Sequence, residues 1–101
     1  MKWVILINED TIQRVSSLLD ILGNPTRLRI LLLIGETKRP LHIKAVARTL
    51  KMDYAAVYRH VKILEASGLL EVYEVGRSRV LILKNAETVN QIIEIANKAI
   101  Q

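Results

Sequence analysis

The sequence contains no cysteine and no phenylalanine, and it has only two histidines. Without cysteine the chain forms no disulfide, supplies no thiolate to a metal and offers no cysteine nucleophile. A reducing compartment is therefore permitted, although cysteine usage alone does not prove one. Trp3 and three tyrosines are the only aromatic residues. The core must therefore be built almost entirely from aliphatic side chains.

Long apolar runs are also absent. The run at residues 3–7 is stopped by Asn8-Glu9-Asp10, so it is too short for a signal peptide or a bilayer span. We expect a soluble, cytoplasmic protein without membrane contact. Residues 2–7 are rich in β-branched side chains but do not alternate. They fit either a strand or an extended arm on another subunit, with Trp3 as its anchor or as a plug of the core.

The 101 residues, half of them hydrophobic, match the size of one domain with a real core. No repeat or low-complexity segment interrupts residues 1–101. The net charge of +5 arises wholly within residues 36–84, where ten lysines and arginines accompany five acidic residues. Such a concentration of charge indicates a polyanionic partner, although a merely solvated basic face is the plain alternative.

Helical periodicity and capping residues outline the first half of the chain. Asn8 begins a helix that ends at Gly23, and Asn24 caps a second helix with Pro25 at its first position. This second helix is apolar nearly all round, so we expect it to be central and to end at Gly35. Residues 36–40 form a polar connection, and residues 41–43 can add a short edge strand.

Two short helices at residues 43–50 and 53–67 predict a helix-turn-helix. Asp53 is the expected N-cap, its carboxylate accepting from a first-turn N–H, and Gly68 is expected to close the helix in a left-handed conformation. At about 100° per residue, one face of the second helix suits a core and the other a polar partner. The core face carries Val57, His60, Val61 and Leu64, and the opposite face carries Ala55, Tyr58, Arg59 and Lys62, with Tyr54 beside them.

Residues 69–75 and 79–83 read as two strands joined by a turn at Gly76-Arg77-Ser78, and Asn85 is expected to cap a last helix. The fold class is therefore mainly α with a small β-hairpin. Apolar stripes on the first and last helices suggest a dimer contact, unless the protein's own core covers them.

Several strings resemble the winged helix-turn-helix regulators of the ArsR/SmtB type. They are LGNPTRLRIL at 22–31, AVYRHVKIL at 56–64, GLL at 68–70 and GR at 76–77, and the resemblance covers about residues 20 to 84. It implies a sequence-specific regulator that binds double-stranded DNA as a homodimer, with residues 1–22 and 85–101 in the dimer contact, residues 43–67 as the helix-turn-helix and residues 69–84 as the wing. Carried over by position, Tyr54, Ala55, Tyr58, Arg59 and Lys62 would face the major groove or its phosphates, and Arg77 and Arg79 the backbone or minor groove.

The sequence departs from the family's metal sensors, which place paired cysteines where this chain has residues 41–45. With only His42 and His60, one subunit cannot assemble a zinc-type set of imidazoles and thiolates. We expect no metal, no cofactor and a packed or hydrogen-bonded His60, and the effector stays unidentified. No phosphate loop or catalytic triad favours an enzyme. The alternatives to a specific regulator are a protein-docking module and an architectural DNA-binding protein.

Overall fold

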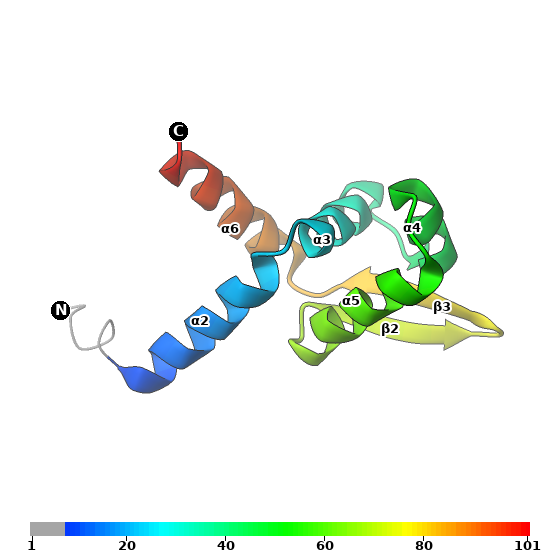
Figure 1. The fold of residues 1–101 in the computed structure, drawn as a ribbon, viewed down its shortest axis with the longest axis horizontal. Helices are drawn as coiled ribbons and strands as arrows, with labels where there is room; N and C mark the ends of the chain where they lie inside the picture. The colour runs from blue at the N-terminus through cyan, green and yellow to red at the C-terminus, as the bar shows by residue number, and fades with distance from the viewer. Residues whose placement is uncertain (1–7) are drawn as a thin grey trace.

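The computed structural model describes residues 8–101, so the expected arm or strand at residues 2–7, with Trp3, lies outside the described residues. Within the described part the chain forms five helices and a three-stranded antiparallel sheet. The elements are α2 Glu9–Leu22, α3 Pro25–Thr37, β1 Leu41–His42, α4 Ile43–Leu50, α5 Tyr54–Ala66, β2 Leu70–Val75, β3 Ser78–Leu83 and α6 Ala86–Ala99. The predicted mainly α fold with a small hairpin is confirmed (Figure 1). None of these helices has the length and apolar character needed to cross a membrane.

The starts of α2 and α3 follow the sequence prediction. The side chain of Asn8 accepts from the backbone N–H of Thr11 at 3.1 Å, and that of Asn24 accepts from Arg27 at 3.1 Å. Each bond satisfies one of the first-turn donors that a helix leaves without a partner.

The prediction that α3 ends at Gly35 is wrong, because the helix continues to Thr37 and closes with Lys38 in the left-handed region. A Cβ at Gly35 would lie 3.4 Å from Cδ1 of Leu83. That distance is an ordinary van der Waals contact, so Gly35 lies inside the helix facing β3, and Lys38 takes the left-handed conformation that ends α3.

Two other predicted caps are correct in position but not in chemistry. Asp53 and Asn85 both precede their helices, yet neither side chain makes the capping hydrogen bond. Asn85 has φ 52°, outside the extended conformation from which a cap normally reaches the first turn. Gly68 has φ 84°, which confirms the left-handed closure expected after α5.

The sheet has the order β1-β3-β2. Val75 pairs with Ser78, so Gly76-Arg77 forms a two-residue turn, and Gly76 supplies the positive φ of 62° that its first position needs. The predicted edge strand is confirmed as β1, where Leu41 pairs with Leu81 and His42 with Val80. Because α4 begins directly after His42, this pairing ties the start of α4 to the hairpin.

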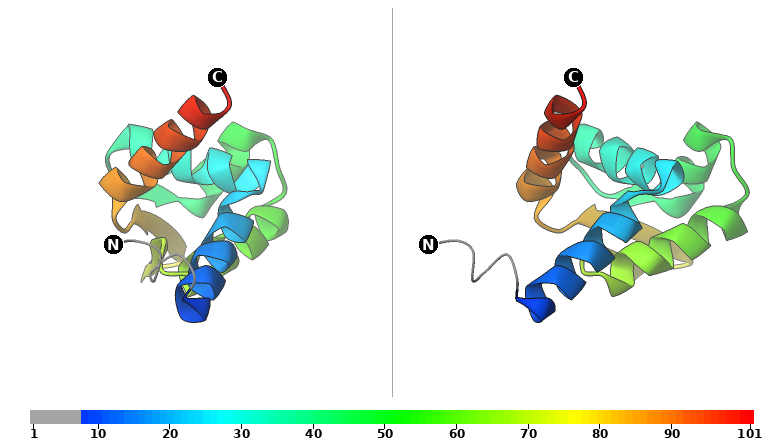
Figure 2. Two further views of the ribbon diagram at one scale, coloured as in Figure 1. Left: turned by 90° about the vertical axis from the view of Figure 1, so that its left-hand side faces the viewer. Right: turned by 60° about the vertical axis from the view of Figure 1, so that its left-hand side comes forward.

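The core lies between α3, α4, α5 and the sheet. Its fully buried large side chains are Ile30, Leu31, Ile43, Val46, Val57, Val61, Leu64, Leu70 and Leu81. Helices α2 and α6 project from this body (Figures 1 and 2), and Leu22 and Val89 are their buried residues. Ile92 and Ile93 of α6 are partly buried against the core, whereas Ile12, Val15 and Leu19 of α2 and Ile95 of α6 stay exposed.

Candidate nucleic-acid interface

The two faces of α5 match the helical-wheel prediction. Val57, Val61 and Leu64 have no exposed surface, whereas Arg59 and Lys62 lie on the outside of the molecule. Burial of three branched aliphatic side chains fixes the rotation of α5 about its own axis, because any other rotation would expose them to water. The outer face is thereby held toward solvent.

A contact between α5 and the hairpin joins three of the predicted site residues, Tyr54, Tyr58 and Arg79, which we call the tyrosine–arginine cluster. The two rings are stacked, with centroids 6.3 Å apart and planes inclined by 11°. Nη1 of Arg79 donates to the hydroxyl of Tyr54 at 3.0 Å, and its guanidinium carbon lies 4.8 Å from the centroid of the Tyr58 ring. The hydrogen bond to Tyr54 raises the pKa of Arg79. Cation–π and hydrogen-bond contacts thus set the hairpin against α5.

Lys62 continues this surface along α5. Its ammonium lies 2.8 Å from the Glu65 carboxylate and 5.8 Å from the centroid of the Tyr58 ring. The hydrogen bond to Glu65, followed by the charge of that carboxylate, raises the pKa of Lys62. Because an exposed ion pair contributes little to stability, Lys62 can exchange Glu65 for another anion at small cost.

Arg59, Arg77 and Ala55 are exposed. Among residues 8–101 the side chains of Arg59 and Arg77 take part in neither of the two ion pairs. The structure thus brings Tyr54, Tyr58, Lys62 and Arg79 together, while Arg59 lies on the neighbouring strip of α5 and Arg77 at the tip of the hairpin. Their guanidinium groups are available to a ligand.

The model of the helix-turn-helix domain family matches residues 22–73, more than half of the chain. The chain belongs to this helix-turn-helix family. A search of curated protein sequences returned no match.

Solved structures show the same fold as this helix-turn-helix protein. Reduced HlyU from Vibrio cholerae is 22% identical, with a TM-score of 0.74 over 90% of this chain and 93% of its own. A homodimeric winged helix-turn-helix DNA-binding domain from Mycobacterium bovis, of a possible ArsR-family regulator, is 17% identical, with a TM-score of 0.76 over 89% and 83%. A transcriptional regulator homologue from Pyrococcus horikoshii is 24% identical, with a TM-score of 0.72 over 92% and 95%. The predicted winged helix-turn-helix fold is confirmed, and the β2–β3 hairpin is its wing.

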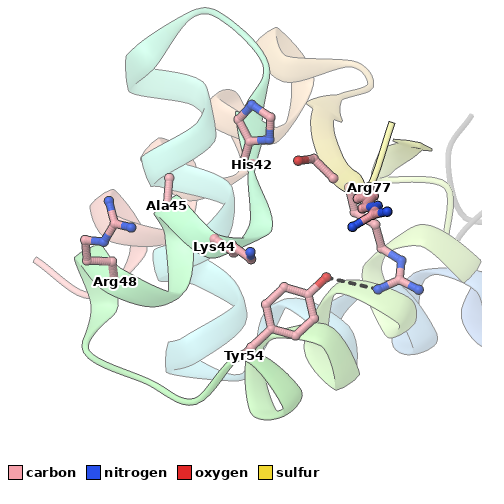
Figure 3. Close-up of a pocket in the computed structure, with 8 residues that line it drawn as sticks. His42, Lys44, Ala45, Arg48, Tyr54 and Arg77 are labelled. Atoms are coloured by element: carbon pink, nitrogen blue, oxygen red, sulfur yellow. Dashed lines mark hydrogen bonds between the residues drawn. The ribbon is translucent and has the colours of Figure 1, made fainter. Parts of the chain in front are cut away.

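A cleft between α4 and the wing was missed by the sequence analysis (Figure 3). This α4–wing cleft has a volume of about 220 Å³. Its lining includes His42, Lys44, Arg48, Tyr54, Arg77 and Arg79. Lys44 and Arg48 contributed to the central excess of positive charge in the sequence, but nothing in their spacing showed that α4 would face the wing.

His60 of this helix-turn-helix protein packs beside Arg27 rather than facing outward. Its Nδ1 lies 3.3 Å from Nη1 of Arg27, whose Nε donates to the carbonyl of Ile21 at 2.7 Å. Because a guanidinium only donates, Nδ1 must accept. The prediction of a hydrogen-bonded His60 is confirmed. Burial, then the charge of Arg27, then that of Arg59 lower the pKa of His60.

Among residues 8–101 no three carboxylates or imidazoles converge on a potential metal position.

The lowered pKa of His60 predicts a pH-dependent stability. The unfolded chain takes up a proton near pH 6.5, while the folded protein resists it, so the free energy of unfolding should fall as the pH drops from about 6.5 through the lower folded-state pKa. The variant His60→Gln keeps a side-chain acceptor for Arg27 but has no group that takes up a proton in this pH range. Thermal unfolding between about pH 7.5 and 5 should show a shallower decline for the variant. Equal declines for both proteins would assign the pH dependence to other groups.

Proposed function

We propose that the protein is a transcriptional regulator that binds double-stranded DNA at specific sequences as a homodimer. Helix α5 enters the major groove, and the wing contacts the backbone or the minor groove. The observation that carries the proposal is the tyrosine–arginine cluster, which brings the cations of the wing, Arg77 and Arg79, next to the outer face of α5 with Arg59 and Lys62. The family match and the fold support this reading. The role is binding rather than catalysis.

The side chains on this surface have different parts in the proposal. Arg59 is exposed and has a fork of donors that fits the O6 and N7 atoms of guanine. Lys62 and Arg77 carry charge for backbone phosphates, which position a protein on DNA without reading its sequence. Ala55, small and exposed, allows close approach of α5 to the groove. Tyr58, next to Arg59 in the chain, adds a phenolic hydroxyl that can donate or accept a hydrogen bond.

Uncovered apolar side chains support a dimer. On α2, Ile12, Val15 and Leu19 are 39%, 48% and 55% exposed, and on α6 Ile95 is 66% exposed. Such a surface is better buried against a second copy than left in water. The homodimeric M. bovis domain has the same fold. We accordingly propose residues 1–101 as one domain, with residues 1–22 and 85–101 as its dimer elements.

In-vitro selection from a random duplex library tests the proposal. We expect an enriched inverted repeat whose half-site centres are about one helical turn, roughly 34 Å, apart, because a two-fold dimer presents two copies of α5. Strong binding that falls steeply with salt but enriches no sequence would point to an architectural DNA-binding protein instead. Retention of no duplex at moderate salt would reject DNA binding and favour a protein-docking module.

A further inference from the structure

The α4–wing cleft concentrates positive charge at a place that the face of α5 does not explain. Lys44 and Arg48 lie on its α4 side, and Arg77 and Arg79 on its wing side. Figure 3 shows Lys44 directed toward the wing, Arg77 across from it and Arg48 at the outer rim. No acidic side chain lines the cleft. In the part of the chain that the structure describes, neither ion pair involves any of these four cations.

We propose that the α4–wing cleft is a binding site for one phosphate group, supplied in the complex by the DNA backbone beside the groove that α5 occupies. The inference rests on the proposed function and adds α4 to the DNA-binding surface. It assigns binding roles to Lys44 and Arg48, which the sequence analysis did not predict.

The donors of the cleft suit a phosphate rather than a carboxylate or a metal. Arginine presents a planar fork to two phosphate oxygens, and lysine adds a compact charge from the opposite wall. Arg79 is already oriented, because Tyr54 accepts from its Nη1 at 3.0 Å. The hydroxyl of Ser78 is a further donor in the lining. Lys44, Arg77 and Arg79 line one concave space with the neutral donor Ser78, and Arg48 adds charge at its rim, an arrangement that matches a group with charge on several oxygens.

Backbone pairing connects the two walls of the cleft at one end. His42 pairs with Val80 in the sheet and is followed at once by α4, so the start of α4 is hydrogen-bonded to the strand that carries Arg79. Tyr54, the first residue of α5, also lines the cleft. A phosphate bound there would therefore lie at the N-terminal end of α5 and would determine how far that helix enters the groove.

The salt dependence of DNA binding tests the phosphate contact. The variants are Lys44→Gln, Arg48→Gln and their combination, and Arg29→Gln is the matched control because Arg29 is exposed on α3, outside the cleft and outside the proposed dimer elements. Affinities for selected and random duplexes are measured between about 50 and 200 mM salt. We expect the slope of log K against log salt to shrink by about one in the double variant, equally for both duplexes, because one phosphate contact releases about 0.9 counterions. The control should keep the wild-type slope.

A second experiment needs no DNA and tests whether a free phosphate ion can occupy the cleft as well as a phosphate of the DNA backbone. Inorganic phosphate is titrated against chloride of equal ionic strength while backbone amide signals are followed by NMR. Saturable shifts at Lys44 and Ser78 that vanish in Lys44→Gln, with competition against DNA, would support the site with a free anion as its ligand. Unchanged salt slopes in the double variant, together with no phosphate-specific shifts, would overturn the proposal. If wild type bound no duplex, the proposed function would fail while the titration still decided the cleft.

Discussion

Arg59→Ala is expected to weaken binding to the selected duplex by roughly 5- to 150-fold, which corresponds to about 1–3 kcal/mol for one bidentate arginine–guanine contact. The side chain lies opposite the buried Val57, Val61 and Leu64 on α5 and is exposed. Its loss should therefore affect recognition and leave folding intact. Fluorescence anisotropy on the selected duplex, and on duplexes with single base changes, measures the effect. Discrimination should disappear at one base pair of each half-site and persist at the others.

Arg77→Ala is the matched control for this experiment, because it removes the same charge from the exposed tip of the wing. It should lower the affinity for all duplexes by a similar factor, as expected for a backbone contact. If Arg59→Ala also weakened every duplex equally, the assignment of Arg59 to base recognition would be wrong, and both arginines would count as phosphate contacts.

Leu19→Glu is expected to convert the dimer into monomers and to reduce affinity for an inverted repeat by at least about tenfold. Leu19 is 55% exposed and lies on the same strip of α2 as Ile12 and Val15. A carboxylate there would lose its hydration in the dimer without gaining a partner. A monomer would also lose the advantage of binding two half-sites together. Light scattering at micromolar concentration and anisotropy on one and two half-sites measure both effects.

Gln13→Glu provides the control for Leu19→Glu, since it adds the same charge to an exposed position of α2 away from the apolar strip. This variant should stay dimeric and bind the inverted repeat as wild type does. A monomeric wild-type protein would contradict the proposed dimer outright. A dimeric Leu19→Glu variant would instead move the interface away from this face of α2.

The features that sequence predicted correctly depend on neighbours within a helical turn or two. The caps at Asn8 and Asn24 need only the next three residues, and the buried face of α5 follows from the spacing of Val57, Val61 and Leu64. Gly35 shows the limit of such reasoning. Its sequence context resembles a helix end, but α3 continues past it to Thr37 and places it beside Leu83, a residue far along the chain.

In the candidate site too, the features set by nearby residues could be predicted from the sequence, and those set by residues far along the chain could not. The wheel placed Tyr54 and Tyr58 on one side of α5, four residues apart and therefore close in space. Their contact with Arg79 depends on the register of the wing, in which Glu74 pairs with Arg79, and on how the sheet packs against α5. From the sequence, these three side chains are therefore predicted as separate DNA contacts, whereas in the structure they contact one another. The cleft beside them requires the same long-range information.

The side chain of Arg27, on α3, contacts both α2, which belongs to the proposed dimer surface, and α5, which belongs to the proposed DNA-binding surface. One guanidinium group bonds the carbonyl of Ile21 at the end of α2 and also His60 on α5. A tilt of α2 at its junction with the body therefore pulls on the helix that is proposed to enter the groove. By thermodynamic reciprocity, an association that fixes α2 in one orientation and a duplex that fixes α5 in one orientation assist or oppose each other by the same free energy. Arg27 thus adds a direct polar contact to the packing of α3 against both helices, and a signal acting at the dimer contact has a short path to the DNA-binding helix.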